Sequence, residues 1–324
     1  MPHFNRSALI AESIRSVEDQ TYKNWELIIV DDGSDETELE KIKHYGSIPG
    51  IRLICANNET KGAAACRNLG FRLATGKYIV FLDSDDVLEP FCLAQRLAVI
   101  TKDPGLDWAV FLQYAWRPGR SSNPVFNKPL KNKEEAIDWF FKMDPPWQTM
   151  APIWKKETLV KLNGFDASLI YMEDPDLHLR ALLDPSLKVS FNYDLPADSY
   201  YRLGNMDIDK SSTFYHLSII SRFAFLEKLL TFLKEEQNGD EDSFSKCKRS
   251  IRTGFYNFVR DFLIYRIGEY NAQFDASLKK MGSYDILTWW DIYKLKALRN
   301  VFLSKSRLVS MLKLRGLLYK ALLN

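Results

Sequence analysis

The chain has 324 residues, about twice the usual length of a globular domain, so one large domain with an appendage and two domains are both possible. Hydrophobic residues make up 46% and charged residues 27%, which are ordinary globular values and exclude a disordered or collagen-like chain. The formal net charge of +2 is too small to predict a nucleic-acid partner.

The first 110 residues alternate between helical and strand periodicity. Apolar residues recur every three or four positions in some segments and form short continuous runs in others. The predicted elements in chain order are residues 9–17 (helix), 25–30 (strand), 51–55 (strand), 63–73 (helix), 78–82 (strand) and 88–100 (helix). This alternation predicts a parallel sheet covered by helices, with ligands bound beyond the carboxyl ends of the strands.

The rest of the chain changes character twice. Residues 117–135 are rich in Pro, Gly, Asn and Lys and predict a loop, while 108–116 and 188–193 predict further strands of a sheet that becomes mixed. From about residue 211 the pattern is wholly helical, with a polar break at 235–245. We therefore expect a domain boundary near residues 204–212.

Carboxylates cluster after one of the buried strands, in Asp83-Ser84-Asp85-Asp86. Such groups repel one another unless a hard divalent cation neutralises them, so Asp83 and Asp85 predict a Mg or Mn site. Asp86 has a simpler explanation, because it can cap the next helix with Glu89 completing a capping box.

A second acidic turn, Asp31-Asp32-Gly33-Ser34, follows the strand at 25–30. Alone it could be an ordinary turn, since Asp and Gly form turns at many strand ends. Combined with Lys61-Gly62 and Arg67-Asn68, it predicts a pocket that binds a base and ribose and places a cation near a diphosphate. Arg67 could equally be an exposed arginine on a helix.

Seven motifs occur in order along the chain: Pro2-His3-Phe4-Asn5-Arg6, Ser16-Val17-x-x-Gln20-Thr21, Trp25–Ser34, Gly62–Gly70, Gly76–Asp86, Gly164-Phe165-Asp166 and Glu173-Asp174. Together they resemble family 2 glycosyltransferases of the GT-A fold, over roughly residues 2–204. The resemblance implies an α/β fold with a mixed, mainly parallel central sheet flanked by helices. Its donor half would span 1–95 and its acceptor half 96–204, followed by a helical region at 205–324 with a basic amphipathic end.

The same resemblance implies roles for individual residues. Pro2, Phe4, Asp31 and Asp32 match positions that hold the nucleobase, and Arg67 matches a donor-side arginine. Asp83 matches the ribose-side carboxylate, which also stands beside the metal, and Asp85 matches the metal ligand. Glu173 and Asp174 match the acceptor-side motif, in which the aspartate is the usual general base.

The residues around Asp174 agree with that role. Asp174 precedes Pro175 and an apolar helical pattern, so we expect it at a helix N-cap, where the helix dipole keeps a carboxylate ionised. Trp147 falls where the acceptor-side loop is expected, and its ring suits stacking on a sugar, although Trp is also an ordinary core residue.

The chain departs from the family pattern in two places. The family has a buried apolar strand before the Pro-x-x-Asn turn, and only Met1 stands there, so a central strand is expected to be missing. We therefore expect either that the native start lies elsewhere or that the chain is poorly stable. A histidine that many relatives place after Tyr200-Tyr201-Arg202 is absent. His178 and His216 are alternative third ligands, but a lone histidine is more often structural.

The resulting hypothesis is an inverting enzyme that moves a sugar from a nucleoside diphosphate sugar, with UDP sugars preferred, onto a carbohydrate or lipid-linked acceptor hydroxyl, in surface polysaccharide or lipopolysaccharide assembly. The cofactor expected for this transfer is a Mg or Mn ion. A nucleotidyltransferase and a non-catalytic nucleotide-sugar binder or scaffold remain alternatives. The oligomeric state is left open.

Location is predicted from what the sequence lacks and from its basic end. The chain contains no Cys-x-x-Cys pair, no 18-residue apolar run and no signal-peptide core, so a reducing cytoplasm is expected. Residues 294–324 contain eight basic side chains, no carboxylate and many interleaved leucines. That segment predicts either an ordinary packed helix or a peripheral contact with an anionic membrane at its inner face.

Overall fold

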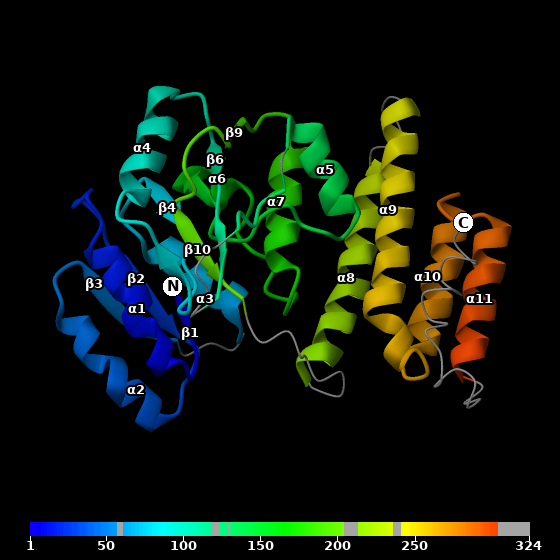
Figure 1. Ribbon diagram of the computed structural model, residues 1–324, viewed down its shortest axis with the longest axis horizontal. Helices are drawn as coiled ribbons and strands as arrows, with labels where there is room; N and C mark the ends of the chain where they lie inside the picture. Colours follow the sequence, from blue (N-terminus) through cyan, green and yellow to red (C-terminus); the bar gives the residue numbers. More distant parts are fainter. Residues whose placement is uncertain (57–60, 118–123, 129, 204–212, 236–240, 304–324) are drawn as a thin grey trace. The chain divides into compact units, whose positions relative to one another are not determined.

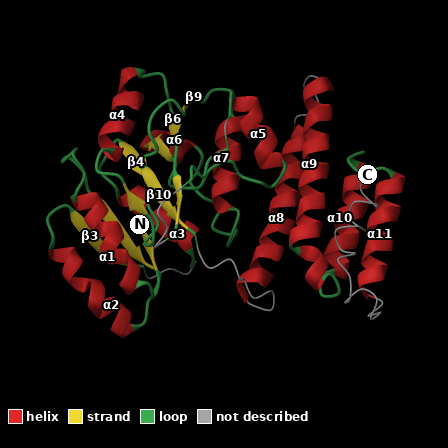
Figure 2. Cartoon of the chain, viewed as in Figure 1, coloured by secondary structure: helices red, strands yellow, loops and turns green. Residues whose placement is uncertain are grey.

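The computed structural model describes residues 1–56, 61–117, 124–128, 130–203, 213–235 and 241–303 (Figure 1). The chain divides into two compact units, Met1–Ile137 with Pro146–Asp207, and Asp138–Pro145 with Ile208–Asn324. All strands of the described residues fall in the first unit (Figure 2). The boundary predicted at 204–212 lies outside the described residues.

Strands and helices alternate along the first unit, and helices continue alone in the second. The strands are β1 (Pro2–His3), β2 (Leu27–Asp31), β3 (Ile51–Cys55), β4 (Tyr78–Val80), β5 (Val87–Leu88), β6 (Trp108–Phe111), β7 (Tyr114–Trp116), β8 (Pro152–Lys155), β9 (Val189–Asn192) and β10 (Ser199–Arg202). The helices are α1 (Ser7–Glu18), α2 (Glu36–Ile42), α3 (Ala63–Leu73), α4 (Cys92–Lys102), α5 (Lys133–Phe141), α6 (Lys156–Lys161), α7 (Glu173–Leu183), α8 (Thr213–Glu235), α9 (Glu241–Asp261), α10 (Asn271–Ser283) and α11 (Trp289–Leu303).

The strands pair in three sheets. The order β1-β2-β3 is parallel throughout, β4-β8-β6-β9 is mixed, and in β5-β10-β7 the central strand runs antiparallel to β5 and parallel to β7. The predicted α/β class with mixed, parallel-containing sheets is therefore confirmed. Where a central strand is expected to be missing, β1 pairs in parallel with β2 over two residues, Pro2 opposite Val30 and His3 opposite Asp31.

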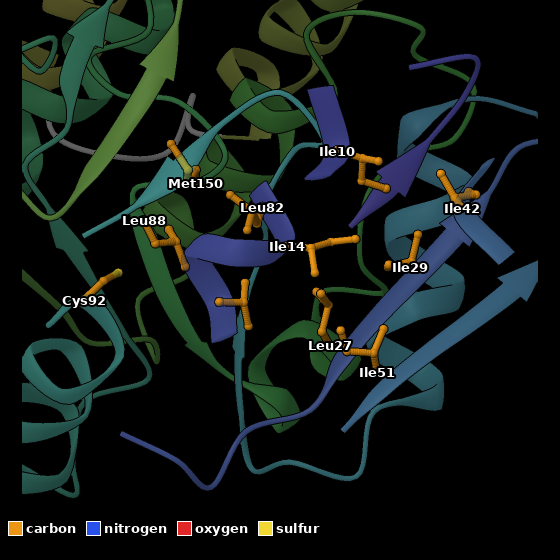
Figure 3. Close-up of a cluster of buried hydrophobic side chains, with 11 residues drawn as sticks. Ile10, Ile14, Leu27, Ile29, Ile42, Ile51, Leu82, Leu88, Cys92 and Met150 are labelled. Carbon is orange, nitrogen blue, oxygen red and sulfur yellow. The ribbon is translucent and has the colours of Figure 1, made fainter. Parts of the chain in front are cut away.

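The parallel sheet is buried on both faces, and β2 shows why its sequence is a continuous apolar run. Leu27 and Ile29 face a cluster that includes Ile10 and Ile14 of α1, and Figure 3 shows Ile14 among these side chains. The alternate residues of β2 lie in another cluster, with Cys66 of α3. Because side chains alternate along a strand, this double burial requires apolar residues at successive positions.

The second unit packs helices around aromatic residues. Phe223 of α8 meets Phe258 of α9 edge to face at 5.0 Å between ring centroids, and Phe255 of α9 stacks near Phe274 of α10. The Asp291 carboxylate of α11 accepts a hydrogen bond from Arg252 at 2.6 Å. Among the described helices, none combines the length and apolarity that crossing a bilayer requires.

Some predicted helix and strand boundaries are correct and others are wrong. Helix α3 spans the predicted residues, but the helix predicted at 88–100 begins at Cys92, because Val87 and Leu88 pair with β10 instead. The prediction that Asp86 caps that helix is thus wrong. Asp86 Oδ1 accepts the backbone N–H of Arg202 at 2.8 Å, which fastens β10 beside the acidic turn. The strand predicted at 108–116 is two strands, β6 and β7.

Candidate active site

The turn after β2 is held by a buried carboxylate. Asp31 Oδ2 accepts the backbone N–H groups of Gly33 (3.1 Å) and Ser34 (2.9 Å), while Oδ1 lies 2.9 Å from His3 Nδ1. Burial opposes ionisation, but hydrogen bonds from Ser34 and His3 outweigh it and hold the pKa of Asp31 below its usual range. Asp31 is 1% exposed and saturated by protein contacts, so it shapes the turn.

Its neighbour Asp32 has a different environment. Asp32 Oδ2 accepts the N–H of Gly62 at 2.8 Å, which ties the turn to the start of α3. Oδ1 is buried and has no hydrogen-bond partner among the described residues. A buried carboxylate oxygen without a donor is costly unless a ligand supplies one. Of the two aspartates, Asp32 is therefore the one with a carboxylate oxygen left for a ligand.

The loop after β1 forms the opposite side of this turn. Asn5 has a left-handed φ of 49° and bonds Ser34 Oγ through its N–H (2.9 Å) and Asp35 through its side chain (3.1 Å). Phe4 is 51% exposed, which leaves its ring free to contact a planar group, and Pro2 lies in β1. These contacts bring together the two motifs that the sequence predicts to hold a nucleobase.

Arg67, on α3, bridges two acidic motifs that are 90 residues apart in sequence. It is 5% exposed, and it donates from Nη2 to Asp83 Oδ1 (2.7 Å) and from Nη1 to Glu173 Oε1 (2.8 Å). Burial disfavours the charged guanidinium, but Asp83 and Glu173 raise its pKa above the usual range. The exposed-helix interpretation of Arg67 is wrong, since this buried arginine holds Asp83 and Glu173 together.

The acidic turn beyond β4 is anchored by arginines. Arg6 Nη1 donates to Asp85 Oδ2, and Arg202 Nε donates to the Asp85 backbone carbonyl at 2.7 Å. Arg202 also lies 4.0 Å over the Trp116 ring. Burial and the nearby charge of Asp83 raise the pKa of Asp85, although Arg6 opposes the shift.

Glu173 and Asp174 begin α7, after a strained residue. Met172 is the N-cap and has a left-handed φ of 69°, so the prediction of Asp174 as the N-cap is wrong and Asp174 instead lies in the first turn. Burial, followed by the charge of Glu173, raises the pKa of Asp174 well above its usual range. This is opposite to the shift expected from the helix dipole alone, because desolvation and a like charge dominate.

Tyr201 shows that the acidic motifs converge. Burial raises the pKa of its hydroxyl to about 12, and the charges of Asp86, Asp174, Asp83 and Asp85 all add to that shift. The sequence analysis did not assign a role to Tyr201, Arg202 or Arg6. The motif Tyr200-Tyr201-Arg202 was visible, but nothing local indicated that β10 runs alongside the acidic turn.

The surroundings of Trp147, His178 and His216 bear on the stacking and ligand roles considered for them from the sequence. Trp147 is fully buried and donates from Nε1 to His178 Nδ1 at 3.1 Å, so it belongs to the core and is unsuited to stack on a sugar. His178 packs near Trp108 and Trp154, which stack on each other at 4.5 Å between ring centroids, and burial lowers the pKa of His178 to about 3. His178 is a neutral core residue, which argues against a ligand role. His216 bonds Tyr270 in the second unit.

The residues present suit a hard divalent cation. Asp83 and Asp85 each keep one carboxylate oxygen that accepts no hydrogen bond from another described residue. No set of three His, Cys, Asp or Glu side chains arranged for a metal occurs within the described part of the chain. A Mg or Mn ion there would take two carboxylates and complete its shell with water and diphosphate oxygens, which is typical of nucleotide-bound Mg.

Comparisons with known proteins show which sequences and folds this chain is similar to. Residues 1–156 match the sequence model of glycosyl transferase family 2, which confirms the resemblance. The amylovoran biosynthesis glycosyltransferase AmsB of Erwinia amylovora is 31% identical over 187 residues, 56% of this chain and 62% of AmsB. The Escherichia coli UDP-Glc:alpha-D-GlcNAc-diphosphoundecaprenol beta-1,3-glucosyltransferase WfgD is 39% identical over 103 residues, 32% of this chain and 40% of WfgD. The chain thus spans less than two thirds of either relative.

Among solved structures, residues 1–349 of S. aureus TarS in complex with UDP-GlcNAc match with a TM-score of 0.65. The match covers 93% of this chain and 86% of that chain at 18% identity. At that identity the likeness establishes a shared fold.

Proposed function

We propose that this chain, whose residues 1–156 match glycosyl transferase family 2, transfers a sugar from a nucleoside diphosphate sugar to an acceptor hydroxyl with inversion at the anomeric carbon. The observation that carries the proposal is the Arg67 bridge. It holds Asp83 on the donor side and Glu173 on the acceptor side at 2.7 and 2.8 Å, with Asp174 next to Glu173. Donor and base motifs are thereby fixed around one site.

The donor would be a nucleotide sugar held at the turn after β2. The Asp32 oxygen that lacks a partner would accept an N–H of the base, and the exposed ring of Phe4 would stack on that base. A UDP sugar is our preference, supported by the UDP-GlcNAc complex of TarS and by the UDP-Glc in the name of WfgD. Residues 1–204 would form the catalytic domain.

In the mechanism, Asp174 accepts the proton of the acceptor hydroxyl as that oxygen attacks the anomeric carbon. Its raised pKa makes it a stronger base than an ordinary aspartate. Arg67 orients Glu173 beside it and opposes the rise that burial causes in the pKa of Glu173. A divalent cation on Asp83 and Asp85 would stabilise the charge that builds on the departing diphosphate. One base and one displacement give inversion.

We further propose a carbohydrate or lipid-linked acceptor in surface polysaccharide assembly, on the cytoplasmic side of a membrane. The names of AmsB and WfgD, which specify amylovoran biosynthesis and a diphosphoundecaprenol acceptor, support this class. A lipid-linked acceptor would bring the enzyme to a membrane surface as a peripheral protein.

A donor panel tests the proposed activity. The full chain is incubated with UDP and GDP sugars and Mn, and the release of nucleoside diphosphate is compared with that of Asp174→Asn. We expect slow release from one donor by the unmodified chain, and a ligand at a hundred times its Kd should add about 2.7 kcal/mol of stability. A parallel incubation supplies UTP and a sugar 1-phosphate in place of the nucleotide sugar, and release of pyrophosphate there would indicate a nucleotidyltransferase. Binding without turnover, even with acceptors supplied, would indicate a non-catalytic binder.

A further inference from the structure

Three guanidinium groups surround the acidic turn, and they differ in how firmly each is held. Arg67 is buried and fixed between two carboxylates. Arg202 is held by the Asp85 carbonyl, by Glu12 at 2.5 Å and by the Trp116 ring. The Arg6 side chain is 54% exposed, and its one hydrogen bond within the described residues goes to Asp85 Oδ2.

The backbone of Arg6 is nevertheless well placed. Asn5, directly before it, is fixed to Ser34 and Asp35 by three hydrogen bonds of 2.9 to 3.1 Å. The guanidinium can therefore leave Asp85 by side-chain rotation alone, while the loop that carries it stays in position. The Arg6 guanidinium occupies one oxygen of a carboxylate that the proposed function assigns to a divalent cation.

We propose that Arg6 acts as a displaceable counter-ion: it neutralises Asp85 in the donor-free chain, and the divalent cation takes its place when it binds. This inference rests on the proposed function for the identity of the cation site. Without a partner, the partly buried Asp85 carboxylate would be exposed to the like charges of Asp83 and Asp86, which repel it. Arg6 relieves that repulsion until a cation arrives, and it weakens cation binding by competing for the same oxygen.

The expected size of the effect follows from exposure. Exposed ion pairs are worth up to about 1 kcal/mol, which corresponds to about a fivefold change in affinity. We therefore expect Arg6→Gln to bind Mn²⁺ about three to five times more tightly than the unmodified chain. The difference in Mn²⁺ affinity between the two chains should narrow as the NaCl concentration rises, because salt screens the exposed Arg6–Asp85 pair.

The experiment is a Mn²⁺ titration of the full chain by calorimetry, with and without saturating UDP, for the unmodified protein, Arg6→Gln and Arg15→Gln. Arg15 is the matched control, because it lies on α1, is exposed and makes no ion pair within the described residues. Circular dichroism and Tm confirm that each variant is folded. UDP affinity in EDTA is measured in parallel.

The outcomes separate the proposals. Tighter Mn²⁺ binding by Arg6→Gln, with Arg15→Gln unchanged, supports displacement. Equal affinities for all three chains, weaker Mn²⁺ binding by Arg6→Gln, or an equal gain in Arg15→Gln would overturn it. UDP binding without any Mn²⁺ binding would remove the cation site and the inference but leave the transferase proposal standing. No UDP binding under any condition would refute the preference for UDP sugars, and no binding of any donor in the panel would refute the proposed function itself.

Discussion

Adjacent residues at the start of α7 have different surroundings. Glu173 is 9% exposed and bonded to Arg67, whereas Asp174 is more exposed and accepts no hydrogen bond from another described residue. An acceptor hydroxyl needs a carboxylate whose oxygen is available, so we assign the proposed base role to Asp174 and the proposed orienting role to Glu173.

Asp174→Asn should therefore abolish transfer and leave donor affinity within a few fold, because the amide cannot take a proton but occupies the same volume. Turnover assays and donor calorimetry on this variant check both parts. Lost donor binding would show that Asp174 belongs to the donor pocket. Full transfer by the variant would remove it as the base.

The raised pKa of Asp174 gives a pH dependence with a definite sign. The base works when ionised, so kcat/KM should fall as pH falls through that raised pKa, at a higher pH than an ordinary aspartate would give. The free energy of unfolding depends on pH with the opposite sign. The native state favours the protonated Asp174 carboxyl, so this group destabilises the native state at higher pH. A pH–rate profile, together with a higher Tm for Asp174→Asn at neutral pH, would show both effects. An acid limb near pH 4 would contradict the first.

Asp85 gives the test of cation dependence. Asp85→Asn removes a cation ligand and also relieves repulsion with Asp83, so the fold should remain while turnover falls at least about a hundredfold. Turnover with graded Mn²⁺ and in EDTA measures the effect, and Tm reports the fold. Undiminished activity in EDTA would remove the metal from the reaction.

At the level of elements, one clamp joins α3 to the segment before α7. Asn68 donates to the Phe165 carbonyl and accepts the Phe165 N–H, both at 2.8 Å. Gly164, with φ of 65°, allows that approach, because a Cβ there would lie 2.3 Å from Asn68 Oδ1. The clamp keeps Arg67 opposite Glu173, so Gly164 positions the site from outside it.

Gly164→Ala should therefore lower stability by more than the ~1–2 kcal/mol that a left-handed conformation alone costs. Gly33→Ala is the matched control, since Gly33 has φ of 82° and only an ordinary contact, 3.8 Å to Lys61 Nζ, at its Cβ position. Urea unfolding of both variants separates strain from steric overlap. Equal losses would mean that Asn68 moves aside without cost.

The sequence predicts elements well where the pattern is local. Helix α3 was bounded correctly, because its apolar spacing and its flanking Gly62 are contained in one segment. The wrong predictions concern residues whose contacts are with segments far away in sequence. Val87 and Leu88 look helical until β10 is known to pair with them, and the contact from Arg6 to Asp85 spans 79 residues. The motifs predicted which side chains matter, but pairing of strands decides which of them meet.

At the scale of the whole chain, charge is unevenly distributed. Residues 294–324 hold eight basic side chains and no carboxylate, whereas residues 1–293 contain 36 Lys and Arg and 42 Asp and Glu. Residues 304–324 lie outside the described part, but α11 leads into them and exposes Trp289 (67%), Trp290 (61%) and Tyr293 (57%). Exposed Trp and Tyr beside basic residues are typical of a membrane interface.

We therefore expect the full chain to sediment with vesicles that contain anionic lipid, less so as salt rises, and little with neutral vesicles. Leu295 and Leu298 are buried, so the informative deletion removes 304–324 and spares α11. Replacing Lys313, Arg315 and Lys320 by Glu is a second variant that keeps the length of the chain. Each Lys or Arg near an anionic surface contributes ~1 kcal/mol, so either change should release the protein into the supernatant. Equal recovery of the unmodified and altered chains in the supernatant at low salt would show that the basic end does not contact the membrane.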